Sequence, residues 1–367
     1  MKPIIPYGGF FAFQGDQVAA IPLAGQLAVE KGARVASFAD CGLVLAAWNQ
    51  FAGQGLWSGD ESAVAYDLAL TNLTELSSLA GLPHTPAADP GQLLWRLFRT
   101  FGREFVEKLR GAFAFALWDG RDRQLLVVTD FYGIRPVVYC QNNQRFAAAS
   151  RIRQLALAGI DRQINPEAIY HYLFFQAVCS PVSIYKDVHK LEPGRGMVVE
   201  NRTVKPFVHY DIRYETLQQD EAYWRKAIPA AVQQAVGHYV SHDAPDRTGC
   251  FLSGGTDSST IAGYVTRLSG RSARTFSIGF DDPQYNELEF ARIAVNQFVT
   301  EQHEYLVSPA DVLNLIEELS RIFYEPLGNA SVVAAYYCAK LGSSQGIRNM
   351  LGGDGGDVIF GGNERYV

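Results

Sequence analysis

The chain has 367 residues, 48% of them hydrophobic, and a formal net charge of −6. This length favours two domains, and the apolar fraction is sufficient for a large core. The sequence has neither a basic block that would indicate a nucleic-acid or membrane surface nor an apolar run near the ~18 residues of a membrane span.

The cysteines indicate a reducing environment. There are five, they lie far apart, and they form neither a CxxC pair nor a zinc-binding spacing. The N-terminal "MKPIIPYGGF" contains two prolines and no long apolar region, so we expect no signal peptide. A cytoplasmic protein with reduced thiols is therefore expected.

The first part of the chain, residues 1–205, reads as a β-rich domain with a few helices. Two apolar runs enclose a polar turn in "GAFAFALWDGRDRQLLVVTD" and again in "VVYCQNNQRFAAAS", and each pattern predicts a β-hairpin. Residues 91–111 have apolar side chains at helical intervals. A further helix is predicted at "NPEAIYHYLFF", with Asn165 as its N-cap and Pro166 as its first residue.

The second part, residues 220–367, alternates strand and helix patterns. Short apolar strands are predicted at "GCFL", "RTFSIGF", "EYLV" and "NML", with amphipathic helical patterns separating the first three and a further helix over 331–341. Such alternation predicts βαβ units and a mostly parallel sheet. Ligands of these sheets bind at the carboxyl ends of the strands.

A glycine-rich loop follows the first of these strands, in "FLSGGTDSST". Its glycines allow the backbone to approach an anion closely, and the N–H groups at the start of the next helix suit a phosphate. Asp257 would repel that phosphate unless a cation lay between the two, and Mg²⁺ binds carboxylate and phosphate oxygens together. The loop lacks GxxxxGK[ST], so it is not a Walker A loop.

A second glycine-rich loop, "LGGDGGDVIFGG", follows the last predicted strand and carries Asp354 and Asp357. One acid from each loop could hold a single metal ion, which would explain why carboxylates occur in loops suited to anions. The alternative is that both loops are only tight turns.

These motifs resemble the asparagine synthetase family of ATP pyrophosphatases over nearly the whole chain. "SGGTDSS", "FSIGF" and "LGGDGGD" match its nucleotide-binding half, and "LRGAFAFALWD", "DFYGIRPVVY" and "VHKLEPGRGMVV" match its glutaminase domain. The resemblance implies an α/β protein. An Ntn-hydrolase-like αββα domain would come first, followed by a doubly wound parallel-sheet ATP-pyrophosphatase domain of the adenine nucleotide α-hydrolase type.

The resemblance also implies a ligase reaction. A small-molecule or peptide carboxylate attacks the α-phosphate of ATP, and ammonia or an amine then displaces AMP to give an amide. Mg²⁺ would be held by Asp257 and Asp357, and Asp354 would take part in forming the adenylate. The positions that would bind the nucleotide and its pyrophosphate end are Phe251, Ser253, Gly254, Gly255, Asp257, Ser258, Ile278, Gly352 and Gly353. A homodimer is compatible with the family.

The first domain departs from the family in its glutaminase residues. Lys2 and Pro3 stand where the family begins with its catalytic Cys, and Cys41 is internal. The glutamine-binding Asn-Gly is Asp67-Leu68, and Asp89 is the one acid retained from a second glutamine-binding motif. We expect a domain that keeps the fold and has lost glutamine hydrolysis, with Asp89 as a vestige of the glutamine site.

The second domain also departs from the family. Tyr324 replaces the first residue of Asp-Glu-Pro and Asn329 replaces a following Asp. We expect these positions near the acceptor pocket, which puts aspartate as the substrate in doubt. The chain stops at Val367, where family members continue into a helical region with a lysine, so a fragment or a natural truncation is expected. His303 and Glu287 are interpreted as structural, and Cys250 as buried.

Three functions remain open from the sequence. An asparagine synthase-like ligase fits the family motifs best. An amide-ring-forming or peptide-ligating relative, of the β-lactam synthetase or lasso-peptide cyclase type, also fits, because such relatives lack the N-terminal Cys. A catalytically silent scaffold is the third.

Overall fold

The computed structural model describes residues 9–15, 34–40, 42–49, 53–82, 89–142, 145–155, 158–201, 203–240, 245–281 and 286–362. Lys2, Pro3, Cys41 and Val367 lie outside these ranges. The chain divides into two compact units. Unit 1 contains residues 1–214 together with 322–328, and unit 2 contains 215–321 and 329–367.

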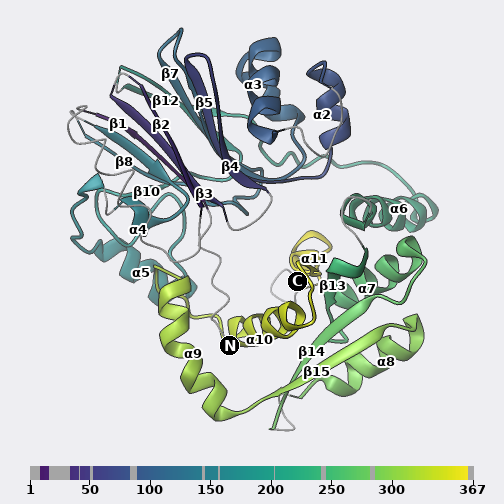
Figure 1. Ribbon diagram of the computed structural model, residues 1–367. Helices are drawn as coiled ribbons and strands as arrows, with labels where there is room; N and C mark the ends of the chain where they lie inside the picture. Colours follow the sequence, from purple (N-terminus) through teal and green to yellow (C-terminus); the bar gives the residue numbers. More distant parts are fainter. Residues whose placement is uncertain are drawn as a thin grey trace. The chain divides into compact units, whose positions relative to one another are not determined.

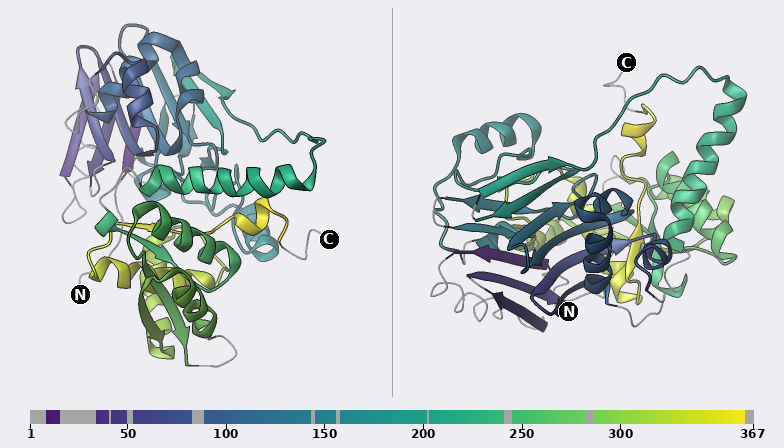
Figure 2. Two further views of the ribbon diagram at one scale, coloured as in Figure 1. Left: turned by 90° about the vertical axis from the view of Figure 1, so that its right-hand side faces the viewer. Right: turned by 90° about the horizontal axis from the view of Figure 1, so that it is seen from above.

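Unit 1 consists of two six-stranded antiparallel sheets that pack face to face (Figures 1 and 2). Sheet A has the order β10-β8-β9-β1-β3-β2. Its strands are β10 (His189–Lys190), β8 (Val138–Gln141), β9 (Phe146–Ala149), β1 (Gly9–Gln14), β3 (Leu43–Asn49) and β2 (Arg34–Asp40). Sheet B has the order β12-β11-β7-β6-β5-β4. Its strands are β12 (Thr203–Val208), β11 (Arg195–Glu200), β7 (Gln124–Thr129), β6 (Gly111–Asp119), β5 (Ser62–Leu70) and β4 (Gln54–Gly59).

Strand β6 shows why two sheets form. Ala114, Ala116 and Trp118 point into the core between the sheets, and Phe113 and Phe115 point into the outer core of sheet B. Both faces of the strand are apolar because side chains alternate between two different cores. The predicted hairpin is confirmed, with Asp119 paired to Gln124 across the turn.

Helices cover the outer faces of both sheets, which confirms the αββα arrangement. Helices α2 (Leu73–Leu79), α3 (Pro90–Phe101) and the 3₁₀ helix η2 (Gly102–Lys108) pack on sheet B. Helices α4 (Ile152–Leu155) and α5 (Pro166–Phe175) lie on sheet A. The side chain of Asn165 accepts a hydrogen bond from the Glu167 N–H at 3.1 Å, so the predicted N-cap is confirmed.

The helix predicted over 91–111 is divided in the structure. Gly102 has a φ of 58°, which ends α3 and starts η2, and residue 111 already belongs to β6. The apolar spacing in the sequence continues past this glycine because the 3₁₀ helix that follows also buries apolar side chains, Phe105 and Val106.

Unit 2 contains a four-stranded parallel sheet in the order β15-β14-β13-β16. The strands are β13 (Thr248–Phe251), β14 (Arg274–Phe280), β15 (Glu301–Val307) and β16 (Asn349–Leu351). The main helices are α6 (Glu221–Val240), α7 (Thr256–Ser269), α8 (Leu288–Phe298), α9 (Pro309–Ile322) and α10 (Ser331–Ser344), with the short η4 (Pro245–Arg247) and α11 (Gly356–Ile359).

Helices lie on both faces of this sheet. Side chains of α6, α7 and α8 form one core with β13, and α9 and α10 pack on the opposite side against β14 and β15. Figure 1 shows α7 and α8 on one side of β14 and α10 on the other. The predicted doubly wound parallel sheet is confirmed. None of the described helices is both long and apolar enough to cross a membrane.

Candidate active site

The two glycine-rich acidic loops leave the sheet of unit 2 from neighbouring strands. β13 lies between β14 and β16, and Cys250 is paired with Leu351. After β13 the chain adds β14 and β15 on one side, and it then returns to place β16 on the other side of β13. The loops after β13 and β16 border the crevice at this point. Such a switch point is where open α/β sheets bind ligands.

Asp257 lies directly against the second loop. A Cβ added to Gly353 would stand 2.7 Å from Asp257 Cβ, and one added to Gly356 would stand 2.4 Å from Asp257 Oδ2. A side chain at Gly353 would collide with the backbone of Asp257 and Ser258, and one at Gly356 would displace the Asp257 carboxylate. The structure thus brings together the two loops that the sequence linked through a shared metal.

The first loop is held by its own hydrogen bonds at the start of α7. Ser253 Oγ and Ser258 Oγ are 3.1 Å apart, and the Gly255 N–H donates to Ser253 Oγ at 3.3 Å. Gly255 is the N-cap of α7, so the first N–H groups of this 14-residue helix face outward without helical partners. Gly254, with a φ of 90°, is packed against α8, where an added Cβ would stand 2.3 Å from the Phe290 carbonyl carbon.

A cavity of about 820 Å³ is bordered by both loops and by α8 and α10. It contains four carboxylates and no Lys or Arg among its described lining residues. Phe276, Ile278 and Ala334 give it an apolar side that suits a base ring. The predicted residues that line it are Phe251, Ser253, Gly255, Asp257, Ser258, Ile278, Gly352, Gly353, Asp354 and Asp357. Gly254 does not line the cavity, and the individual roles stay predictions.

Sequence reasoning missed one wall of this cavity. Helix α10 contributes Ser331, Ala334, Ala335 and Cys338, of which Cys338 is buried and has its pKa raised to about 12 by desolvation. Small residues spaced three or four apart were the available signal, but that spacing is ordinary in helices. Glu287, interpreted as structural, occupies the N-cap of α8 without a side-chain cap hydrogen bond and lines the cavity.

The donor set fits Mg²⁺, although the described residues contain no group of three or more potential metal ligands. Asp257 and Asp357 offer carboxylate oxygens, which Mg²⁺ prefers. Magnesium is usually bound by one or two carboxylates together with substrate phosphates and water. Two acids near the N-terminus of a helix are therefore compatible with such a site.

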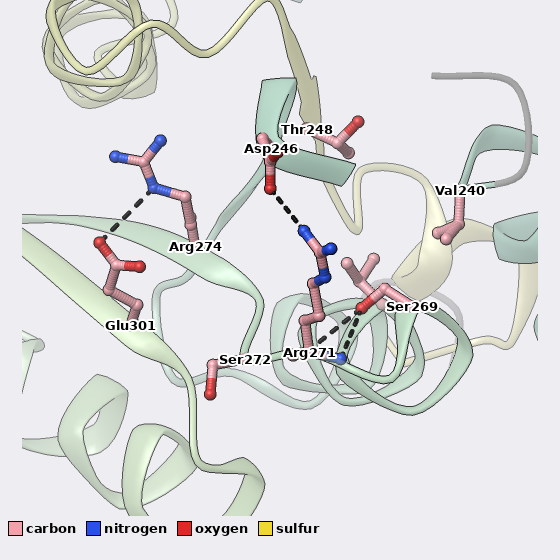
Figure 3. A pocket seen from close by; sticks show the side chains of 9 residues that line it. Val240, Asp246, Thr248, Ser269, Arg271, Ser272, Arg274 and Glu301 are labelled. Atoms are coloured by element: carbon pink, nitrogen blue, oxygen red, sulfur yellow. Dashed lines mark hydrogen bonds and ion pairs between the residues drawn. The ribbon is translucent and has the colours of Figure 1, made fainter. Parts of the chain in front are cut away.

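A second cavity, of about 270 Å³, lies at the amino ends of the strands of this sheet, whereas the first cavity lies at their carboxyl ends (Figure 3). Thr248, Arg274 and Glu301 line it from the amino ends of three strands. Arg274 pairs with Glu301 at 3.5 Å, and Arg271 pairs with Asp246 at 2.8 Å. Because these opposite charges already pair with each other, the cavity presents little charge to a ligand.

Cys250 was interpreted as buried and His303 as structural, and their contacts agree with these interpretations. Cys250 is fully buried, with its pKa raised to about 12. His303 stacks on Phe276 with ring centroids 5.0 Å apart, and its Nε2 is 3.0 Å from Glu301 Oε1. The strand predicted at "EYLV" begins earlier, at Glu301, so His303 lies within β15 rather than before it.

In unit 1, the two acids of the expected glutamine site, Asp67 and Asp89, are bonded to other residues of the chain. Asp67 accepts a hydrogen bond from Gln54 at 3.0 Å and lies 3.2 Å from Arg135 Nε. Asp89 caps α3 by accepting the Gly91 N–H at 2.7 Å, and it also accepts from Tyr66 Oη at 3.2 Å. Burial, with Asp89 as a second cause, raises the pKa of Tyr66.

Tyr324 and Glu325 fold with unit 1 rather than with the second domain, to which the sequence assigned them. Their place near an acceptor pocket stays a prediction. Tyr324 packs against the outer core of sheet A, and Glu325 pairs with Lys190 of unit 1. The segment was misplaced because its motif was read within the second half of the sequence, whereas it folds with the first.

Comparison with known proteins gives two family matches. Residues 227–367 match the asparagine synthase family, and residues 63–210 match the glutamine amidotransferase domain family. The chain is 30% identical over 276 residues to asparagine synthetase [glutamine-hydrolyzing] 1 of Bacillus subtilis (strain 168), covering 75% of this chain and 43% of that protein.

Two further relatives are more distant. Asparagine synthetase [glutamine-hydrolyzing] 3 of B. subtilis is 23% identical over 83% of this chain and 52% of its own length. Amidase chry2 of Gibberella zeae is 24% identical over 75% of this chain and 43% of its own length. The chain thus spans about half the length of these relatives. The two family matches and the relatives together show that the chain belongs to the asparagine synthetase family, with a glutamine amidotransferase-type domain ahead of an asparagine synthase domain.

Proposed function

We propose that the chain contains the adenylating site of a carbon–nitrogen ligase. A carboxylate oxygen of the substrate attacks the α-phosphorus of ATP, the bond to the β-phosphate breaks, and pyrophosphate leaves. The nitrogen of ammonia or an amine then attacks the acyl carbon and loses a proton, and AMP leaves with the bonding electrons. The family match supports this class of reaction. The proposal assigns residues 1–205 to the glutaminase-like domain and residues 220–367 to the ATP-pyrophosphatase domain.

One observation carries the proposal most directly. Two glycine-rich acidic loops border one cavity at the switch point of a parallel sheet, beside the N-terminus of α7. Ser253, Ser258 and the first N–H groups of α7 would bind the departing pyrophosphate, on which negative charge grows. Ile278 and Phe251 would contact the adenine, and the Asp354 side chain would face the reacting phosphate.

Asp257 and Asp357 would hold Mg²⁺. When bound, Mg²⁺ supplies positive charge that offsets the phosphate oxygens during transfer. The composition of the cavity supports this role, because its described lining has four carboxylates and no basic side chain. Without a divalent cation, a polyphosphate would be strongly repelled from such a site.

An exchange assay tests the proposal. Incorporation of labelled pyrophosphate into ATP is measured with Mg²⁺ over a panel of amino acids, dicarboxylates and peptides, with the chain and with Asp257→Asn. We expect at least one acid to support exchange and the variant to lower its rate by about 100-fold or more. Asp246→Asn, which alters an exposed ion pair of the same unit, is the control and leaves the rate unchanged. Exchange that survives Asp257→Asn would exclude the metal assignment.

We further propose that the first domain does not hydrolyse glutamine. Asp67 stands in place of the glutamine-binding Asn, its carboxylate is already paired with Arg135, and Asp89 serves as a helix cap. Incubation with glutamine should release no glutamate above the rate without protein. Turnover that follows protein concentration would contradict this assignment.

A further inference from the structure

A seven-residue segment, Ile322–Gly328, connects α9 to α10 in sequence but folds as part of unit 1. We call this segment the anchor. Tyr324 packs against the outer core of sheet A, and burial raises its pKa to about 12. The sequence that follows the anchor returns to unit 2 at residue 329.

An ion pair with little solvent exposure holds the anchor. Lys190 Nζ lies 2.6 Å from Glu325 Oε2, and each side chain is only 14% exposed. Glu325 Oε1 also accepts the Ile184 N–H at 2.9 Å, and Lys190 donates to the Val178 carbonyl. Removing one partner would leave the other charge buried without its counter-ion, which is strongly unfavourable.

The other end of the anchor is fixed by the backbone. The Gly328 N–H donates to the Gln176 carbonyl at 2.8 Å, and a Cβ at Gly328 would stand 2.8 Å from Gln176 Cβ. Next in sequence, Asn329 Oδ1 accepts from both the N–H and the Oγ of Ser331, at 2.9 and 2.7 Å. Only Asn329 and Ala330 thus separate the fixed Gly328 from the first residue of α10.

We propose that Lys190 and Glu325 are positioning residues for the nucleotide cavity. Helix α10 supplies one wall of that cavity, from Ser331 to Cys338. Because only two residues lie between the anchor and this helix, the contacts that hold the anchor would restrain the first turn of α10. The amidotransferase-type domain would then support nucleotide binding without performing catalysis. The proposal rests on the adenylating function insofar as the cavity is taken to bind ATP.

Two measurements on the whole chain test the anchor. The first is hydrogen–deuterium exchange of peptides covering 322–338, and the second is the Kd for Mg²⁺–ATP by calorimetry. We expect Lys190→Met to raise exchange in both the anchor and the first turns of α10 and to weaken ATP binding by about tenfold. Lys190→Arg retains the charge and should restore both values towards the unaltered chain.

The matched control is Lys205→Met, which removes an ion pair of the same 2.6 Å length with Glu200 on the edge strand β12 of the same unit. It should change neither measurement. If Lys190→Met does not fold, Glu325→Gln is used instead, since its amide oxygen can still accept the Ile184 N–H.

The outcomes separate this proposal from the adenylating function. Unchanged exchange over 331–338 overturns the anchor, and so does faster exchange there with an unchanged Kd for ATP. If the unaltered chain binds no Mg²⁺–ATP, the adenylating function fails. Exchange over 331–338 then decides the anchor, with a rise in Lys190→Met supporting it and no rise overturning it.

Discussion

Single glycines set the position of the Asp257 carboxylate, which we propose binds Mg²⁺. Gly356 belongs to α11 with ordinary helical geometry, so an alanine there would meet no backbone strain, only the Asp257 carboxylate 2.4 Å away. The position therefore separates the effect on the site from the effect on folding.

We expect Gly356→Ala to push Asp257 aside and weaken Mg²⁺–ATP binding by about tenfold or more. The free energy of unfolding should change by less than about 1 kcal/mol, because alanine is favoured over glycine in helices. Calorimetry and urea unfolding measure the two quantities. Gly237→Ala in α6, where the nearest atom would be 3.9 Å from the added Cβ, is the control and should bind ATP normally. Equal affinity in Gly356→Ala would refute the placement of Asp257.

Residue patterns indicated much of this site before the structure. A short strand followed by glycines and an acid can be recognised within about ten residues of sequence. Both loops, with the acids Asp257, Asp354 and Asp357, could therefore be identified from the sequence alone. The α10 wall could not, because Ala334 and Ala335 carry no chemical signal and reach the cavity only through tertiary packing. The contacts of Glu325 were also out of reach, since its partner Lys190 lies 135 residues away in sequence.

Among the elements, the connection after β7 depends on one buried carboxylate. Asp130 is fully buried and accepts the N–H groups of Phe113, Tyr132, Ile134 and Arg135 at 2.8–3.2 Å. This residue opens the "DFYGIRPVVY" stretch that matches the family, and here it organises the loop that carries Arg135 to Asp67.

Asp130→Ala should destabilise the chain by about 3 kcal/mol or more, because several backbone N–H groups would lose their acceptor. Urea unfolding followed by tryptophan fluorescence measures this loss. Asp122→Ala, an exposed position in the neighbouring hairpin turn, should stay within about 0.5 kcal/mol of the unaltered chain. Similar stabilities for the two variants would show that the loop is held by other contacts.

Element prediction succeeded where one period ran uninterrupted. The two apolar runs of β6 and β7 with their polar turn, and the Asn-Pro start of α5, were read correctly, because each is coded within a few residues. The division of α3 from η2 at Gly102 was missed, since glycine is tolerated inside helices and the apolar spacing continued.

For the whole molecule, the stability of unit 1 should depend on pH through His209. Its Nε2 donates to the Thr129 carbonyl at 2.9 Å within a cluster of aromatic rings, and burial lowers the pKa of this imidazole. The unfolded chain, with an ordinary His pKa of about 6.5, therefore takes up the proton first. Stability is full above that value and falls as pH decreases towards the folded pKa.

Urea unfolding of the chain and of His209→Gln between pH 7.5 and 5.5 measures this contribution. The amide of glutamine can still donate to Thr129 but does not titrate. The unaltered chain should lose more stability over this range than the variant does. Parallel pH dependences would contradict the assignment.

The anchor also has a consequence for synthesis on the ribosome. Residues 1–214 are complete before Ile322 is translated, and at about 5–20 residues per second the delay is on the order of 5–20 s. During that interval the outer core of sheet A lacks Tyr324, which packs against it in the folded chain, and Lys190 lacks its counter-ion. The nascent first domain therefore lacks part of its packing and one counter-ion until the anchor has been translated.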